Sequence, residues 1–211
     1  MRRRKCDAEQ TRSNLLDAAE RVFHRRGVSH TSLCEIAGEA GVTRGAFYWH
    51  FNNKADLIHA LHQRMNQRIN QGLSPILHRK IDALQTLRAL MMYMLYDSLC
   101  DPQQRVTLEI LLLKSEYHGE VKQVFESVVV ARDAWREMMH TLFLEAQAQG
   151  SLRCDVTADA MLETLRYLLY GSLSLWLMEP QFKADRARVE TLVNIFFEGM
   201  TPVRIKLSST V

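Results

Sequence analysis

The segment from Ser32 to Phe51 constrains the fold of this chain more than any other. It opens with a capping-box sequence, in which the hydroxyl of Ser32 and the carboxylate of Glu35 satisfy free backbone N–H groups at a helix start. Gly41 tolerates the positive φ of a tight turn between two helices. The inward-facing residues that set the crossing of those helices are small or apolar: Ile36, Ala37, Val42 and Phe47. The pattern predicts two short helices joined by a tight turn, the second over residues 43–50.

The rest of the 211-residue chain is also patterned for helices. Nine glycines and four prolines give few interruptions, and an apolar stripe predicts a first helix over residues 8–26 that stops at Gly27. We therefore expect an all-α fold of about nine helices. Residues 1–54 would form a basic arm and a three-helix domain, with the helix-turn-helix at about 33–52, and residues 55–211 a second helical domain. The fourth helix is expected to continue to about residue 71 and to break between Gly72 and Pro75.

Positive charge gathers at the N-terminal end of the sequence. Residues 1–54 hold ten Lys and Arg against six Asp and Glu, whereas the whole chain has a net charge of +3. The run Arg2-Arg3-Arg4-Lys5 is the densest part. A local basic region on a nearly neutral body favours a nucleic-acid-binding module, and a solvated basic tail is the alternative.

The second helix of the motif presents an unusual outer face. Thr43 and Arg44 stand at the end that usually meets bases, and an arginine can bridge O6 and N7 of guanine. Tyr48, Trp49 and His50 can donate hydrogen bonds to phosphate oxygens. The alternative places Tyr48 and Trp49 in the core. Lys54, in the first turn of the next helix, adds an ammonium where a phosphate can bind. Because two other aromatic residues already suit the inner face, we expect these side chains to face DNA.

The segment from Thr11 to Leu57 resembles the N-terminal domain of the TetR family of repressors. The resemblance is carried by Leu15-Leu16-Asp17-Ala18-Ala19, Phe23, Gly27, Glu35-Ile36-Ala37, Ala40-Gly41-Val42 and the run from Thr43 to Lys54. It implies a homodimer that binds a palindromic double-stranded operator and leaves it when a small molecule binds the C-terminal domain. The implied DNA contacts are Ser32, Thr43, Arg44, Gly45, Tyr48, Trp49, His50 and Lys54.

The second half is similar to the multidrug-efflux (AcrR-like) branch of that family, through residues 108–117 and through Gly171 followed by Trp176. This implies a small hydrophobic effector and control of an efflux operon, and so of antibiotic resistance. Some relatives place Asn and His where Leu108 and Leu112 stand, so their ligand hydrogen bonds do not carry over. A TetR-type regulator of a metabolite, acyl compound or quorum signal is one alternative, and a DNA-binding protein without ligand control is another.

Methionines and aromatic residues in the second half are predicted to line the effector pocket. Methionine adapts its shape to varied apolar ligands, although an ordinary core explains each position singly. Arg166 is a polar anchor in this prediction, or else a surface charge. The predicted ligand-binding residues are Met91, Met94, Leu95, Leu108, Leu112, Trp135, Arg166, Tyr167 and Tyr170.

The last two predicted helices carry more apolar surface than one chain needs. The resemblance implies that they pair with their copies in a four-helix bundle. Two-fold symmetry would place the recognition helices roughly 34–36 Å apart or somewhat more. The candidate interface residues, some of which can instead belong to the core of one chain, are Leu162, Leu165, Leu169, Trp176, Leu192, Phe196 and Phe197.

Other classes of function lack support in the sequence. G-x-S-x-G, P-loop and G-x-G-x-x-G motifs do not occur, so we expect neither an enzyme nor a cofactor. His59 and His62 have no third ligand at metal-binding spacing, so no metal site is expected. The four cysteines form no C-x-x-C, and residues 167–178 are too short to span a bilayer. These features predict a cytoplasmic protein with reduced thiols.

Overall fold

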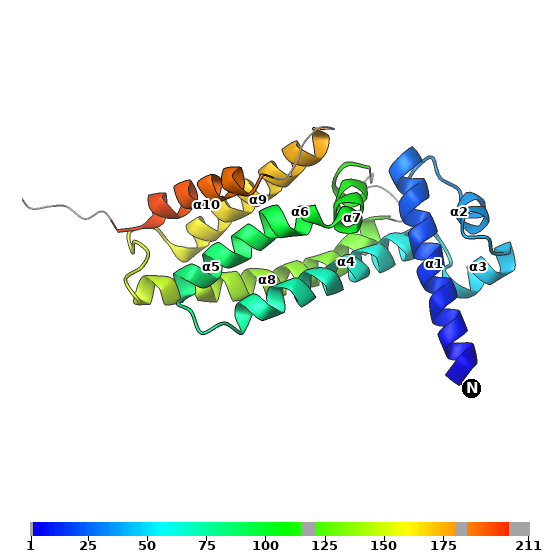
Figure 1. Cartoon of the computed structure of the whole chain (residues 1–211), viewed down its shortest axis with the longest axis horizontal. Helices are drawn as coiled ribbons and strands as arrows, with labels where there is room; N and C mark the ends of the chain where they lie inside the picture. The colour runs from blue at the N-terminus through cyan, green and yellow to red at the C-terminus, as the bar shows by residue number, and fades with distance from the viewer. Residues whose placement is uncertain (1, 115–120, 180–184, 203–211) are drawn as a thin grey trace, which may run out of the picture.

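The computed structural model describes residues 2–114, 121–179 and 185–202, and it describes side chains for 7–114, 133–179 and 185–202 (Figure 1). Within these ranges all regular structure is helical. The segments are α1 (Arg2–Arg26), α2 (Leu33–Glu39), α3 (Arg44–His50), α4 (Lys54–Leu77), α5 (Ala83–Met92), the π-helical turn η1 (Tyr93–Asp97), α6 (Ser98–Cys100), α7 (Pro102–Leu113), α8 (Val121–Ala148), α9 (Ala158–Met178) and α10 (Arg186–Met200). Because α5, η1 and α6 follow without a break, the described part of the chain holds nine helices. The predicted all-α fold is confirmed.

The first three helices and the start of α4 enclose a small core. α1 begins six residues earlier than the stripe predicted, at Arg2, and ends as expected before Gly27, whose φ is +78°. Gly41 has a φ of +67°, as the tight turn requires. Apolar side chains of all four helices meet in this core, among them Leu15, Phe23, Ile36, Phe47, Phe51 and Leu61.

α4 does not break where the sequence predicts, because it runs through Gly72 and Pro75 to Leu77. The last turn buries Leu73 and Ile76 in the larger core, and this burial outweighs the poor helix propensity of glycine and proline. Gly72 has a packing role instead. A Cβ at this position would collide with the ring and hydroxyl of Tyr93, the residue at which η1 begins.

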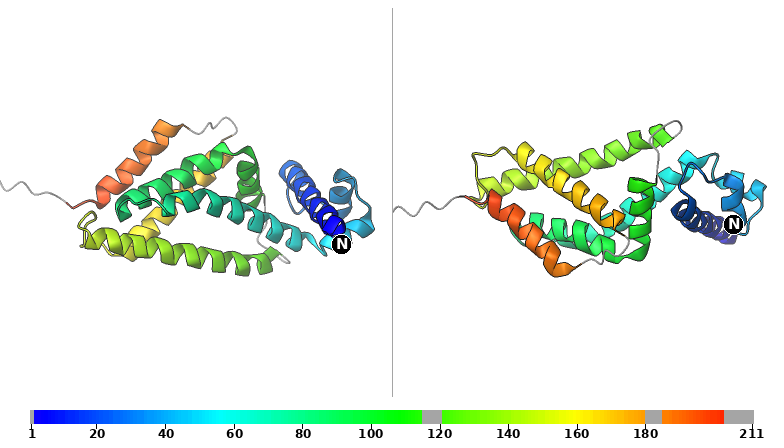
Figure 2. Two further views of the ribbon diagram at one scale, coloured as in Figure 1. Left: turned by 60° about the horizontal axis from the view of Figure 1, so that its bottom comes forward. Right: turned by 90° about the horizontal axis from the view of Figure 1, so that it is seen from above.

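The remaining helices form a long bundle with the three-helix domain at one end (Figures 1 and 2). α8 is its longest helix and packs on α4, α5 and α9. α10 lies along α5 and η1. The core of the bundle draws on all these helices, with Leu87, Leu95, Phe143, Leu165 and Phe197 at 0 % exposure. No helix among the described residues is both long enough and apolar enough to cross a membrane.

Candidate DNA-binding surface and its junction with the helical body

The capping box that the sequence predicts at Ser32 forms, and Thr43 adds a cap at the start of α3 that was not predicted. The backbone N–H of Ser32 donates to Oε2 of Glu35 at 2.8 Å, and that of Glu35 donates back to Oγ of Ser32 at 3.2 Å. Thr43 caps α3 by accepting from the N–H of Ala46 at 3.2 Å. These contacts fix where α2 and α3 begin, and so fix which side of α3 faces outward. They also occupy the hydroxyl of Ser32, whose DNA contact stays a prediction.

The outer side of α3 is aromatic and basic. Tyr48 is 43 % exposed and Trp49 73 % exposed, whereas Phe47 is 1 % exposed. The alternative that placed Tyr48 and Trp49 in the core is therefore wrong. Arg44 and Gly45 are exposed as well. A surface with this much exposed aromatic area, beside a guanidinium, is free to contact a macromolecule.

Neighbouring side chains order this surface. The guanidinium of Arg44 lies over the ring of Tyr48, with its carbon 5.5 Å from the ring centre, and its hydrogen bond with Tyr48 raises the pKa of Arg44. The rings of Trp49 and His50 pack edge to face, with their centres 4.7 Å apart. His50 is half-buried, and its pKa is lowered by burial and then by the charge of Arg12. The imidazole of His50 is therefore mainly neutral at pH 7 and still offers one N–H donor.

Lys54 is used differently from the prediction. Its Nζ donates to the backbone oxygens of Val28 and Ser29, each at 3.1 Å. The ammonium therefore fastens the loop between α1 and α2 to the start of α4. A phosphate contact by this ammonium remains a prediction, with two of its three N–H donors engaged by the loop.

The predicted effector residues do not form one group. Met91 and Leu95 are buried, while Met94, Leu108, Leu112 and Trp135 are partly buried against the same bundle core. Tyr167 and Tyr170 are instead 72 % and 51 % exposed on α9, which buries its opposite face. These two tyrosines therefore do not line a buried pocket within one chain, and their contact with an effector stays a prediction. Arg166 pairs with Glu163 one turn away at 2.5 Å.

The predicted dimer residues are also placed differently. Six of them lie inside the core of one chain, because each is on the face of α9 or α10 that packs on the bundle: Leu162, Leu165, Leu169, Trp176, Phe196 and Phe197. A second copy cannot touch them without opening this core, and Leu192 is only partly buried. The outer faces of α9 and α10 expose other large apolar side chains, namely Tyr167, Tyr170, Leu175, Met178 and Ile195.

Sequence reasoning missed the junction between α1, α4 and α7. Its centre is Glu20, a carboxylate that is only 4 % exposed. Oε1 of Glu20 accepts from the hydroxyl of Thr107 at 2.7 Å and lies 2.9 Å from a guanidinium nitrogen of Arg64, and Oε2 accepts from the amide of Gln103 at 3.0 Å. Arg64 also pairs with Asp17 at 2.6 Å. A buried charge needs such partners, so these contacts lock the three helices together.

The contact between α1 and α7 continues toward the end of α7. Nε2 of His24 lies 2.6 Å from Oε2 of Glu109, and Nζ of Lys114 donates to the carbonyl oxygen of His24. The N–H of Val28 donates to the carbonyl of Lys114 at 3.2 Å. The only sequence signal for this junction is the pair of polar residues Gln103 and Thr107, spaced i, i+4 on a mainly apolar helix.

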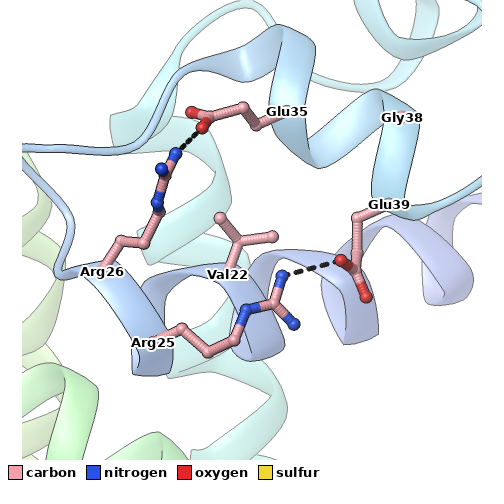
Figure 3. A pocket seen from close by; sticks show the side chains of 6 residues that line it. All are labelled: Val22, Arg25, Arg26, Glu35, Gly38 and Glu39. Carbon is pink, nitrogen blue, oxygen red and sulfur yellow. Dashed lines mark hydrogen bonds and ion pairs between the residues drawn. The ribbon is translucent and has the colours of Figure 1, made fainter.

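A hollow of about 250 Å³ lies between α1 and α2, and none of the predicted effector residues lines it (Figure 3). Charged side chains line it, and Figure 3 shows Arg26 paired with Glu35 and Arg25 paired with Glu39. Hydrogen bonds from Arg25 and then Arg21 lower the pKa of Glu39 to about 2. Because four charged side chains line this hollow and pair with one another, it does not suit an apolar effector.

A helix-turn-helix with a basic, aromatic outer helix, mounted on a helical bundle, is the architecture of a DNA-binding regulator. Comparison with known proteins agrees. The chain matches the family "Bacterial regulatory proteins, tetR family" over residues 15–61 and "MAATS-type transcriptional repressor, C-terminal region" over residues 82–202. The chain belongs to the TetR family.

Relatives match over most of their length. The HTH-type transcriptional regulator TtgR of Pseudomonas putida is 33 % identical over 184 residues, which cover 85 % of this chain and 86 % of TtgR. NalD of Pseudomonas aeruginosa, described as the secondary repressor of the MexAB-OprM multidrug efflux pump, is 31 % identical, with a TM-score of 0.81 over 94 % of this chain and 99 % of NalD. SmeT of Stenotrophomonas maltophilia in complex with triclosan is 28 % identical, with a TM-score of 0.76 over 96 % of this chain and 97 % of SmeT.

Proposed function

We propose that this chain is a homodimeric repressor that binds a palindromic operator of a multidrug efflux operon and leaves it when a small apolar molecule binds. The observation that carries the DNA-binding part is the exposed outer face of α3, with Trp49 73 % exposed beside Arg44. The efflux part is supported by relatives such as NalD, whose described role is repression of an efflux pump. Such a repressor acts in the bacterial cytoplasm, on the chromosome.

We propose that the chain has two functional units with their boundary near residue 54, the first for binding DNA and the second for binding the effector. Each has its own group of buried apolar residues, one centred on α1 to α4 and one on the bundle. Thr43, Arg44 and Gly45 meet base edges, while Tyr48, Trp49 and His50 contact phosphates together with Ser32 and Lys54. The effector favours a conformer in which the two α3 helices of the dimer are spaced wrongly for the operator.

The outer faces of α9 and α10 are the proposed dimer interface. They expose Tyr167, Tyr170, Leu175, Met178 and Ile195, and large apolar side chains exposed on a surface are typical of a protein contact. Leu175→Glu should shift the protein toward monomer in sedimentation velocity. The matched control is Leu144→Glu, which places the same charge at an exposed leucine of α8. A Leu175→Glu protein that stays dimeric would remove α9 from the interface.

The DNA-binding part is tested with a fragment from upstream of the repressor's own gene. Footprinting should show one protected palindrome, and protection at many unrelated sites would contradict sequence-specific repression. Arg44→Ala should reduce discrimination between operator and scrambled DNA by about 5- to 150-fold, which corresponds to one lost arginine–guanine pair. Arg186→Ala, at an exposed arginine of α10, is the control and should leave discrimination unchanged. Equal losses on both DNAs for Arg44→Ala would remove its base-reading role.

The alternative effector is a metabolite, an acyl compound or a quorum signal. Titration of the protein–operator complex with candidate ligands distinguishes it from an efflux substrate. We expect apolar efflux substrates to weaken operator binding, since the residues around the bundle core are mostly Leu, Met and aromatic. A long acyl compound that co-purifies with the protein and releases DNA by itself would favour the alternative.

A further inference from the structure

α7 has apolar side chains on two sides, and each side belongs to a different core. Ile110 is fully buried among the residues of α1 to α4, with Val106 and Leu111 packed against the same group. Leu108 and Leu112 pack against the core of the bundle. α7 is therefore shared between the DNA-binding helices and the bundle, and a displacement of one side moves the other.

Gln104 lies on the bundle side of α7, one turn before Leu108 and two before Leu112. It is only 7 % exposed. Its Nε2 donates to Oδ2 of Asp101 at 3.2 Å. Burial raises the pKa of Tyr93, and a hydrogen bond from Gln104 partly offsets that rise. The amide nitrogen is thus well occupied.

The amide oxygen of Gln104, by contrast, accepts no hydrogen bond from the described residues, although Oε1 is fully buried. Leaving a buried acceptor unpaired costs free energy, and a leucine or methionine would avoid that cost. An acceptor kept in this condition is suited to receive a donor from a molecule that binds later.

We propose that Oε1 of Gln104 is the polar anchor of the effector site, and that the effector is an uncharged, mainly apolar molecule that carries a hydroxyl or N–H donor. This inference rests on the proposed function and specifies its ligand. A carboxylate ligand is disfavoured, because a carbonyl oxygen repels it and Asp101 lies beside the site. Partly buried Met94 and Met138 pack against the same core, and their flexible side chains can move to admit a ligand.

The neighbouring residue explains how this anchor reaches the DNA-binding helices. Gln103 donates to Glu20 at 3.0 Å and to Asp17 at 3.4 Å, and it accepts from Arg68 at 2.6 Å. Gln104 and Gln103 are thus adjacent in the chain but face the bundle and α1, respectively. A ligand that displaces Gln104 therefore also displaces Gln103, and with it the contacts of Gln103 at the junction.

Two matched probes test the anchor: 4-phenylphenol, which has a hydroxyl donor, and 4-methoxybiphenyl, which has none. Calorimetric titration of DNA-free protein should show that 4-phenylphenol binds about fivefold more tightly, the ratio expected from one hydrogen bond. Gln104→Met should abolish this preference and leave the affinity for 4-methoxybiphenyl unchanged. Equal binding of both probes to the natural protein, no binding of either, or a preference that persists in Gln104→Met would overturn the proposal.

Gln103→Met is the control, because it replaces the neighbouring amide and leaves the anchor in place. It should retain the preference for 4-phenylphenol, and circular dichroism checks that both variants fold. In an operator titration, 4-phenylphenol should release DNA from the natural protein and release less from Gln103→Met. The calorimetry contains no DNA, so its result stands even if the protein does not bind the operator. In the same way, a protected palindrome in the footprint stands even if Gln104 does not anchor the effector.

Discussion

The hydrogen bond between Thr107 and Glu20 should contribute measurably to stability, because both groups are buried. Thr107 is 2 % exposed and Glu20 4 %, and their oxygens are 2.7 Å apart. Thr107→Val keeps the shape of the side chain but removes the hydroxyl that donates to the carboxylate. A hydrogen bond to a charged group contributes about 1.5–3 kcal/mol, so the free energy of unfolding should fall by that amount. The remaining contacts of Glu20 with Arg64 and Gln103 should keep the variant folded.

Thermal unfolding measures this loss directly. In a chain of this length each kcal/mol lowers Tm by about 2–4 °C, so we expect a decrease of roughly 3–12 °C. Thr141→Val is the control, since Thr141 is exposed on α8 and bonds only to the carbonyl of Glu137 in its own helix, at 3.0 Å. That change should stay within about 0.5 kcal/mol. If the two variants unfold at the same temperature, the hydrogen bond between Thr107 and Glu20 contributes nothing to stability.

Three further outcomes are expected. Gly72→Ala should cost about 1–3 kcal/mol in urea unfolding, since its methyl group would meet Tyr93, whereas Gly38→Ala, with open space around it, should stabilise α2 by about 0.5–1 kcal/mol. Lys54→Met should weaken operator binding and reduce the salt slope by about 0.9, because two of the three N–H donors of Lys54 hold backbone carbonyls and the third is left for a phosphate. The carboxyl of Glu39 should titrate near pH 2 by NMR, so its contribution to stability is present above its usual pKa of 4.5 and is lost as the pH falls toward 2.

The DNA-binding half could be predicted because its signals are local. A capping box at Ser32, a positive-φ glycine at position 41 and the inward spacing of Ile36 and Phe47 each act within one or two turns. Local chemistry decides such features whatever the rest of the chain does. The break predicted at Gly72 fails for the opposite reason, because a distant residue, Tyr93, determines what that glycine is for.

The faces of α9 could not be assigned from periodicity. This helix carries apolar residues almost all round, so its pattern contains both an inner face, with Leu165 and Leu169, and an outer one, with Tyr167 and Tyr170. A hydrophobic pattern says that a side chain avoids water, but not whether its own chain or a partner covers it. The sequence prediction placed the leucines at a partner interface, while allowing that some belong to the core of one chain, and it placed the tyrosines in an effector pocket. In the structure these leucines are buried within one chain and the tyrosines are exposed.

The junction at Glu20 shows why the link between the two halves has to come from the structure. Its members lie on three helices and up to 87 residues apart in the chain, so no spacing rule connects them. Yet the burial of the carboxylate depends on Arg64, Gln103 and Thr107 together, since a buried charge that loses its partners is strongly destabilising. Small displacements of α7 relative to α1 are therefore resisted until several contacts exchange together. That resistance favours two discrete arrangements of the DNA-binding helices over a continuous drift, which is what a repressor that is either on or off its operator requires.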